Sequence, residues 1–327
     1  MAQAKIAERA HATEGEALAA RRTGCYRPPM TTAPRLDHIG IVAHDLAAAA
    51  AQYEQLGFRL TPLARQSGPL APGGAVVPWG SANRCAMLGA GYIELLGIVE
   101  RGLYDNDLGR FLARYQGIHI LALGIDDAEA ELARLRAAGF AIAGIRPMQR
   151  PAGGGIARFQ RLPIPEAQEG RIQLIRHETP ELLWRPELTA HPNRAAGLIE
   201  AVLCVADLEA AAERFRRLAG VAPERGGGAA TFPLAGARLV LCEAPALPAF
   251  VPGATPPTLP WFAGFTLATD DGNEAVRRLL AERGIDHAEA EGRLAVPPDC
   301  AAGAACVFAA ERQASSPAGT GDASIGI

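Results

Sequence analysis

The chain has 327 residues, 49% of them hydrophobic, and a formal net charge of −3. A chain of this size and apolar content can bury sizeable cores, most simply as two domains. The small negative charge gives no general attraction to nucleic acid or to an anionic membrane surface, and no apolar run approaches the length of a membrane span.

The two ends of the chain lack the pattern of a folded core. Residues 1–34 are polar and rich in Ala and Arg, with several Glu, which argues against a signal peptide or a typical transit peptide. Residues 313–327 are rich in Ser, Gly and Ala. We therefore expect a disordered extension and a disordered tail. The six cysteines form no CxxC pair, which is typical of reduced, buried thiols in a cytoplasmic protein.

The first apolar run, LDHIGIVAHDL at 36–46, predicts a strand that leads into a helix. Asp45 is expected to cap this helix, because its carboxylate can accept from the free N–H groups of the first turn, and Gly57 is expected to end it. Further strands are expected near 59–63, 84–88 and 92–98, with a hairpin at 89–91. The unit has the order βαβββ.

A second unit repeats this order from GIHILALGIDD at 117–127, with Asp126 or Asp127 as the helix cap. Its helix is expected to reach about 138, and its strands to lie near 145–149, 157–162 and 171–176. Two shorter copies begin with LIEAVLCVADL at 198–208 and WFAGFTLATDD at 261–271, with helices expected at 209–218 and 273–283. The segment HPNRAAG at 191–197 predicts a hinge, which divides the chain into domains at 35–190 and 191–312.

The repeats place four residues at equivalent positions of the expected first strands: His38, His119, Glu200 and Ala263. The offsets are 119 − 38 = 81, 200 − 119 = 81 and 263 − 200 = 63. Four copies of one supersecondary unit therefore account for nearly the whole chain, which predicts an α+β fold of four βαβββ modules. A histidine in each of the first two copies suggests that one site is built from both.

The paired modules, with the segments LDHIGIVAHDL, GSANRCAMLGAGYIELLG and HETPELLW followed by HPNRAAG, resemble the glyoxalase-like domain proteins of the vicinal oxygen chelate superfamily. That superfamily includes glyoxalase I, extradiol dioxygenases, methylmalonyl-CoA epimerase and fosfomycin and bleomycin resistance proteins. The resemblance covers about residues 36–310 and implies two domains of the vicinal oxygen chelate type. It says little about the substrate, because one fold here serves many chemistries.

The resemblance implies one ligand from the first strand and one from the last strand of each module. Aligning YIELLGI at 92–98 with RIQLIRH at 171–177 pairs Glu94 with Gln173. The candidate metal set is His38, Glu94, His119 and Gln173. Two imidazoles and a carboxylate suit a divalent ion such as Zn, Ni, Co, Mn or Fe and leave positions open for substrate. Gln173 is the weakest member, although a related His/Glu/His/Gln set occurs among the epimerases.

Glu94 lies between Ile93 and Leu95, and a carboxylate in an apolar strand is costly unless it is paired or ligating. As a ligand that can dissociate from the ion, Glu94 is also the candidate catalytic base. The alternative is a structural polar cluster, in which the histidines are hydrogen-bonded core residues and Glu94 pairs with Arg84 or Arg171. Three residues are candidates for orienting a substrate through charge-assisted hydrogen bonds: Asn83, Arg84 and Arg171.

In the second domain the matching positions hold Glu200, Val240, Ala263 and apolar residues at 305–307, which cannot assemble a metal site. We expect that domain to be structural. His177 is expected to form a hydrogen bond that organises the HETPELLW turn rather than to bind the ion.

The sequence thus predicts a glyoxalase-like metalloenzyme of the lyase or isomerase type, in which an ion stabilises an enediolate-like anion of a small oxygenated substrate. One alternative is an Fe(II) extradiol-type dioxygenase that uses His38, His119 and Glu94 as a facial triad. Another is a non-catalytic protein that binds a drug or metabolite. A small-molecule substrate is expected in each case, without nucleic acid or membrane, and a homodimer is left open.

Overall fold

The computed structural model describes residues 33–71, 74–165 and 167–310. The disordered extension expected at 1–34, apart from Ala33 and Pro34, and the disordered tail expected at 313–327 lie outside the described residues. None of the helices described is both long enough and apolar enough to cross a membrane.

The elements follow the predicted α+β order. The first group comprises β1 (Arg35–Ala43), α2 (Leu46–Gln55), β2 (Ala64–Pro69), β3 (Val76–Met87) and β4 (Tyr92–Ile98). A short helix, α3 (Leu108–Leu112), leads to the second group of β5 (Gly117–Gly124), α4 (Ala128–Ala137), β6 (Arg146–Ala152), β7 (Gly155–Pro163) and β8 (Arg171–His177). The second strand of the first group is displaced from the predicted 59–63, and β3 begins well before the predicted residue 84.

The second half of the chain repeats the order after η1 (Pro180–Leu182) and α5 (Pro186–Thr189). Its third group comprises β9 (Ala195–Cys204), α6 (Leu208–Ala219), β10 (Glu224–Gly226), β11 (Ala229–Leu234) and β12 (Ala237–Cys242), followed by η2 (Ala244–Ala249). The fourth comprises β13 (Trp261–Thr269), α7 (Glu274–Arg283), β14 (Ala288–Ala290), β15 (Arg293–Val296), η3 (Pro298–Cys300) and β16 (Ala305–Ala310).

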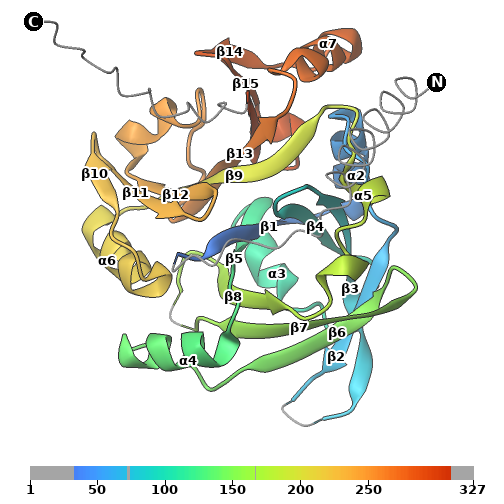
Figure 1. Ribbon diagram of the computed structural model, residues 1–327. Coiled ribbons are helices and arrows are strands. Elements are labelled where there is room, and N and C mark those ends of the chain that lie inside the picture. The colour runs from blue at the N-terminus through green and yellow to red at the C-terminus, as the bar shows by residue number, and fades with distance from the viewer. Residues whose placement is uncertain (1–32, 72–73, 166, 311–327) are drawn as a thin grey trace, which may run out of the picture. The chain divides into compact units, whose positions relative to one another are not determined.

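Within each group the first strand pairs in parallel with the last strand, which pairs with the third, which pairs with the second. The groups are joined through their first strands, because β1 is antiparallel to β5 and β9 is antiparallel to β13 (Figure 1). A single residue pair, Phe262 with Ile118, connects β13 to β5. Each group is therefore a βαβββ module, and we number the modules 1 to 4 in chain order.

Aspartate caps begin three of the module helices. Asp45 accepts from the N–H groups of Ala47 and Ala48, at 2.8 and 3.1 Å, as predicted. In module 2 the cap is Asp127, which accepts from two N–H groups of the first turn, whereas Asp126 forms an ion pair with Arg35. Each helix buries one face, and the apolar residues of all four modules form a continuous core that runs from Leu36 to Phe308.

The four residues predicted to lie on first strands do so: His38 on β1, His119 on β5, Glu200 on β9 and Ala263 on β13. They are not all equivalent, however, because each first strand contains a β-bulge. The residues skipped in the pairing of β1 with β5 and of β9 with β13 are Asp37, His119, Ala196, Ile199 and Ala263.

The offset between modules 1 and 2 is therefore 82 rather than 81, as the helix starts show: 128 − 46 = 82. The residue equivalent to His38 is then 38 + 82 = 120, which is Ile120, and His119 is equivalent to Asp37. The predicted equivalence of His38 with His119 is wrong by one residue. A shift of one residue in a strand moves a side chain to the opposite face of the sheet.

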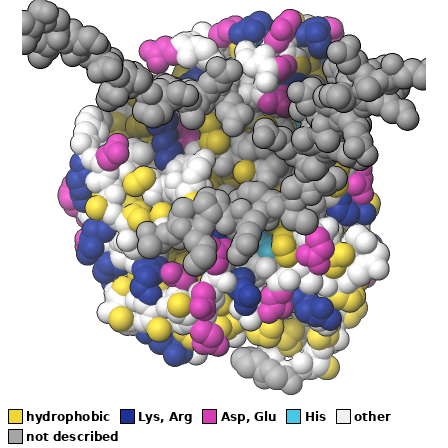
Figure 2. Space-filling view, viewed as in Figure 1, with side chains coloured by type: hydrophobic (Ala, Val, Ile, Leu, Met, Phe, Trp, Pro, Cys, Tyr) yellow, Lys and Arg dark blue, Asp and Glu magenta, His cyan; other side chains and the backbone are white. Residues whose placement is uncertain are grey.

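The five described cysteines are free, and all but Cys300 are buried. On the visible part of the face drawn in Figure 2, basic and acidic side chains are interspersed rather than gathered in a patch of one sign.

Candidate functional site

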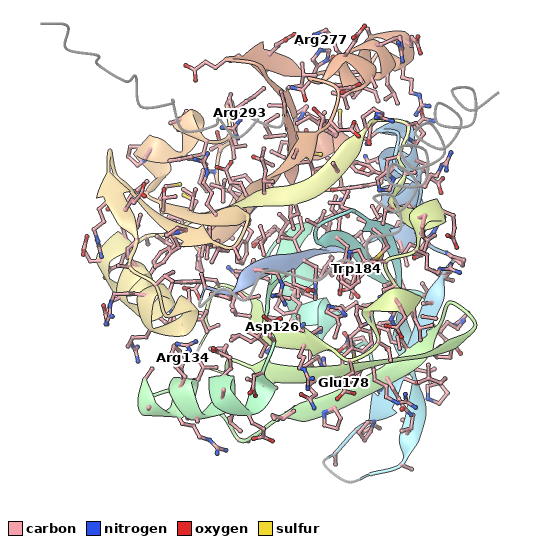
Figure 3. The ribbon with its side chains drawn as sticks, in the orientation of Figure 1. Asp126, Arg134, Glu178, Trp184, Arg277 and Arg293 are labelled. Atoms are coloured by element: carbon pink, nitrogen blue, oxygen red, sulfur yellow. The ribbon has the colours of Figure 1, made fainter. Side chains whose placement is uncertain are left out.

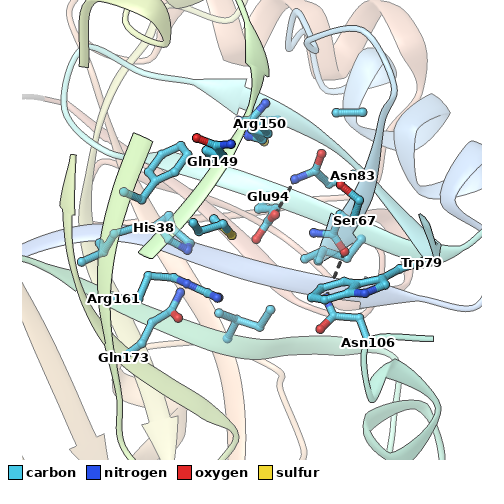
Figure 4. Close-up of a pocket in the computed structure, with 18 of the residues that line it drawn as sticks. His38, Ser67, Trp79, Asn83, Glu94, Asn106, Gln149, Arg150, Arg161 and Gln173 are labelled. Atoms are coloured by element: carbon cyan, nitrogen blue, oxygen red, sulfur yellow. Dashed lines mark hydrogen bonds between the residues drawn. The ribbon is translucent and has the colours of Figure 1, made fainter. Parts of the chain in front are cut away.

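A cavity of about 90 Å³ lies between modules 1 and 2 and is lined by side chains of both. His38 enters it from β1, Glu94 from β4 and Gln173 from β8, so three of the four predicted ligands line one space (Figure 4). Glu94 and Gln173 are equivalent, as predicted, because Gly40 pairs with Glu94 in module 1 and Ala122 pairs with Gln173 in module 2.

His38 is held by a carboxylate that sequence analysis did not single out. Its Nδ1 lies 2.7 Å from Oδ1 of Asp37, and Nε2 of His177 lies 3.0 Å from Oδ2 of the same carboxylate. A carboxylate only accepts, so both imidazoles donate to it. The neutral form of His38 then carries its proton on Nδ1 and keeps the lone pair of Nε2 for a metal ion, a substrate or a proton.

Asp37 is a charged residue inside the protein. Burial alone would raise its pKa, but the charge of His177 and the hydrogen bonds from His177 and His38 hold the pKa of Asp37 well below its usual range. The ring of His38 also stacks on that of Tyr92, with ring centres 4.4 Å apart. Both contacts fix the orientation of His38. His177 thus forms a hydrogen bond within the site and does not line the cavity as a ligand.

Glu94 has one of its two oxygens occupied. Asn83 on β3 donates from Nδ2 to Oε1 of Glu94 at 2.5 Å, and both side chains line the cavity. No hydrogen bond within the described residues engages Oε2 of Glu94, so this oxygen is available to a ligand. Asn83, predicted to orient a substrate, therefore also orients the candidate base.

His119 does not join the predicted set. Because it occupies the bulge of β5, its ring lies outside the cavity, stacked between Phe111 and Tyr115 with ring centres 5.0 and 4.0 Å away. Its Nε2 donates to the carbonyl oxygen of Tyr115 at 2.8 Å, and the side chain is fully buried. Burial lowers the pKa of His119 to about 4, which makes it neutral near pH 7. Ile120 takes its place in the cavity wall.

Arg84 also departs from the prediction, because successive residues of a strand point to opposite faces and Asn83 points into the cavity. The guanidinium of Arg84 instead pairs with Glu54 at 2.9 Å and donates to the carbonyl oxygen of Thr61. Arg171 does line the cavity, as predicted, and its Nη2 donates to the carbonyl oxygen of Asn106 at 2.7 Å.

Three arginines that line the cavity, Arg65, Arg150 and Arg161, were missed by the sequence analysis. Burial and the neighbouring charges of Arg171 and Arg146 lower the pKa of Arg161 to about 10, although Glu94 acts in the opposite direction. The signal that could have identified Arg161 is strand phase, since it shares a face of β7 with Phe159 and both line the cavity.

Modules 3 and 4 fill the corresponding region with ion pairs and apolar packing. Glu200 accepts from Thr266 at 2.7 Å and pairs with Arg238 and Arg293 at 2.5 and 2.9 Å. Arg293, labelled in Figure 3, reaches it from β15. Val240 and Ala263, two of the predicted replacements, pack in an apolar cluster with Val202.

No three His, Cys, Asp or Glu side chains of the described residues are grouped as a metal site. An ion in the cavity between modules 1 and 2 would therefore need Gln173 as a ligand beside His38 and Glu94.

The comparisons with known proteins concern the family and the fold of the chain. A family model described as a glyoxalase-like domain matches residues 36–219, more than half of the chain. The chain belongs to this family. A search of the curated proteins finds no significant match.

Three solved structures illustrate the shared fold. A hypothetical protein from Staphylococcus aureus superposes with a TM-score of 0.57 at 12% identity, over 85% of this chain and 99% of that one. A variant of 4-hydroxymandelate synthase from Streptomyces coelicolor gives 0.53 at 15% identity, over 84% and 92%. A Mn(II)-bound glyoxalase from Novosphingobium aromaticivorans gives 0.51 at 14% identity, over 86% and 83%. At these identities the likeness concerns the fold alone.

Proposed function

We propose that the chain is an enzyme of the lyase or isomerase type that transfers a proton on a small oxygenated substrate bound between modules 1 and 2. The observation that carries the proposal is the pairing of two oriented proton-transfer groups in one cavity. Asp37 orients His38, and Asn83 holds one oxygen of Glu94. Groups held in this way need no reorganisation when a proton moves.

In this proposal Glu94 is the base. Its Oε2 accepts a proton from the carbon next to the substrate carbonyl, while Asn83 keeps the carboxylate in place. His38 lies on the neighbouring strand and presents Nε2 to the oxygen on which negative charge develops. Arg161 and Arg171 add positive charge at the same cavity, which stabilises an enediolate-like anion.

A divalent ion fits the donors that line the cavity. Nε2 of His38, the carboxylate of Glu94 and the amide oxygen of Gln173 would hold it, and the Asp37–His38 hydrogen bond is the usual support for a metal-binding histidine. Such an ion polarises substrate oxygens as a Lewis acid. The facial triad required by the dioxygenase alternative is not assembled, because His119 lies outside the cavity.

The test uses a panel of small α-hydroxycarbonyl and 1,2-dicarbonyl compounds in D₂O, with exchange of the proton next to the carbonyl followed by NMR. Wild-type protein is expected to catalyse exchange for at least one compound, and Glu94→Gln is expected to abolish it. Arg158→Gln is the matched control, because Arg158 is exposed on β7 and does not line the cavity. Wild-type protein that binds a panel member without exchange would contradict the enzyme and support a binding protein.

A parallel measurement addresses the metal. Elemental analysis of protein purified without a metal-binding tag is expected to show bound divalent metal in the wild type and its loss in His38→Ala. Metal retained in His38→Ala would contradict the proposed ligands.

A further inference from the structure

Two arginines of the cavity, Arg161 and Arg171, lack the carboxylate partners that desolvated arginines usually have. Within the described residues, Arg161 and Arg171 form no ion pair with a carboxylate, and the Arg161 side chain forms no hydrogen bond. The buried Nε of Arg161 is an unsatisfied donor. The Arg171 guanidinium donates, among the described residues, only to the carbonyl oxygen of Asn106. Desolvated charged groups are normally paired, so two guanidiniums without a carboxylate in a cavity wall point to an anionic ligand.

The surrounding charges strengthen this reading. Arg161 and Arg171 carry like charges near each other. Arg146 adds positive charge near Arg161, and Arg110 adds positive charge near Arg171. The opposing carboxylates are Glu94, which acts on both arginines, and Asp107, which acts on Arg171. The cavity and the hollow that adjoins it are lined by six arginines and two carboxylates, and Arg65 among them is paired with Glu100: Arg65, Arg110, Arg146, Arg150, Arg161 and Arg171, with Glu94 and Asp107. The balance is positive and leaves room for an anion.

The position of the two arginines shows how an anion would be presented. Arg161 and Arg171 line both the inner cavity and an adjoining outer hollow of about 920 Å³, so they lie where the two meet. Gln173 also lies at this junction, whereas His38 and Glu94 line only the inner cavity. An anionic group held by the arginines would therefore place the adjoining carbon toward Glu94.

We propose that Arg161 and Arg171 form a carboxylate-binding site, so that the substrate is a small carboxylic acid whose reacting carbon lies next to the group they hold. This inference rests on the proposed function, because it takes the reaction at Glu94 as given. Planar guanidiniums match the two oxygens of a carboxylate through paired N–H···O bonds, which makes arginine rather than lysine the residue suited to this task.

The test measures binding rather than turnover. Acetate, lactate, pyruvate and malonate are titrated into the full-length protein, each beside its amide, which has the same shape without the charge. Binding is followed by calorimetry and by the rise in melting temperature that a ligand of the native state produces. At least one acid is expected to bind about tenfold or more tightly than its amide, because hydrogen bonds to charged groups contribute more than neutral ones.

The variants identify the residues. Arg161→Gln and Arg171→Gln are each expected to weaken binding of that acid about tenfold or more, while Arg158→Gln leaves it unchanged. Arg161→Lys should restore it only partly, because the charge is kept and the paired geometry is lost. Equal binding of acid and amide, binding unaffected by Arg161→Gln, or displacement by inorganic phosphate at equal concentration would each overturn the carboxylate assignment.

Failure of the proposed function would look different. If Glu94→Gln retains acid binding and wild-type protein shows no proton exchange, the carboxylate site stands and the reaction is wrong. If exchange depends on Glu94 but no acid binds through Arg161, the reaction stands and the carboxylate site is wrong.

Discussion

The two halves of the molecule use the same position of the same fold in opposite ways. His38 on β1 and Glu200 on β9 are equivalent, since the helix starts give 208 − 46 = 162 and 38 + 162 = 200. His38 faces a cavity in which Arg161 and Arg171 lack carboxylate partners among the described residues. Glu200 is closed in by Arg238, Arg293 and Thr266. The difference shows that each pair of modules can place a polar side chain at this position of the first strand. Where other side chains of the protein pair with that group, as they do with Glu200, the position stabilises the fold and leaves no binding site.

The largest effect we expect is on turnover, which should fall in a variant of modules 1 and 2 and stay unchanged in the matching variant of modules 3 and 4. Glu94→Gln removes the proposed base while keeping the hydrogen bond to Asn83 feasible, so proton exchange should fall by about 10²- to 10⁴-fold. Glu200→Gln should leave exchange per folded molecule unchanged, because Glu200 does not line the cavity. The measurement is NMR-detected exchange, normalised to folded protein by circular dichroism. A comparable loss in Glu200→Gln would mean that the halves are functionally coupled.

The stability of the same two variants should show the reverse order. Glu200 is 1% exposed, so Glu200→Gln leaves Arg238 and Arg293 without their carboxylate. Breaking a buried ion pair from one side costs about 3 kcal/mol, and the partial exposure of both arginines keeps the loss near that value or below. Glu94→Gln should change stability far less. Urea denaturation of both variants gives the comparison, and equal losses would contradict the structural role of Glu200.

The two histidines expected to be equivalent provide a third contrast. His119 has a folded-state pKa of about 4, below the ordinary 6.5, so the unfolded chain binds its proton first as the pH falls. Stability should therefore decline as the pH falls from about 6.5 to about 4, by up to about 3 kcal/mol from this group. His119→Phe keeps the stacking between Phe111 and Tyr115 but cannot be protonated, so its unfolding curve should be flatter over that range.

Proton exchange supplies the control for this variant. His119→Phe should retain turnover near the wild-type level, because the ring lies outside the cavity. His38→Phe should abolish it. Loss of exchange in both would restore His119 to the site and contradict the register described for β5.

The element order was predictable from the sequence because apolar runs, Asp caps and helix-ending glycines recur in each module. The strand β3 was shortened in the prediction because its first half, from Val76 to Asn83, contains Pro, Gly and polar residues that do not alternate regularly. Its length depends instead on pairing with β2 and β4. Local pattern does not report such long-range pairing.

The site was predictable only in part, and the reason is the bulge. Glu94, Gln173 and Asn83 reach the cavity as strand phase predicts, whereas a bulge adds a residue that leaves no mark in the hydrophobic pattern. The helix cap contained the missing information. Had Asp127 been chosen over Asp126, the offset of 82 would have made Ile120 the residue equivalent to His38. Arg161 was overlooked because a single Arg in a strand is usually a surface residue.

The smallest effect we expect concerns the stability of the ligand-free protein, and it has the opposite sign to that of Glu200. Arg161 is partly desolvated, its Nε has no partner, and Arg171 and Arg146 repel it, while Glu94 offsets this in part. Replacing such a group by an apolar side chain of similar length removes an uncompensated charge, so Arg161→Met should raise stability by about 1 kcal/mol. Thermal unfolding of Arg161→Met and Arg158→Met in buffer free of carboxylates measures it. Because Arg158 is exposed, Arg158→Met should leave the stability unchanged. A clear loss of stability in Arg161→Met would show that Arg161 stabilises the fold and would contradict its role as a ligand-binding group.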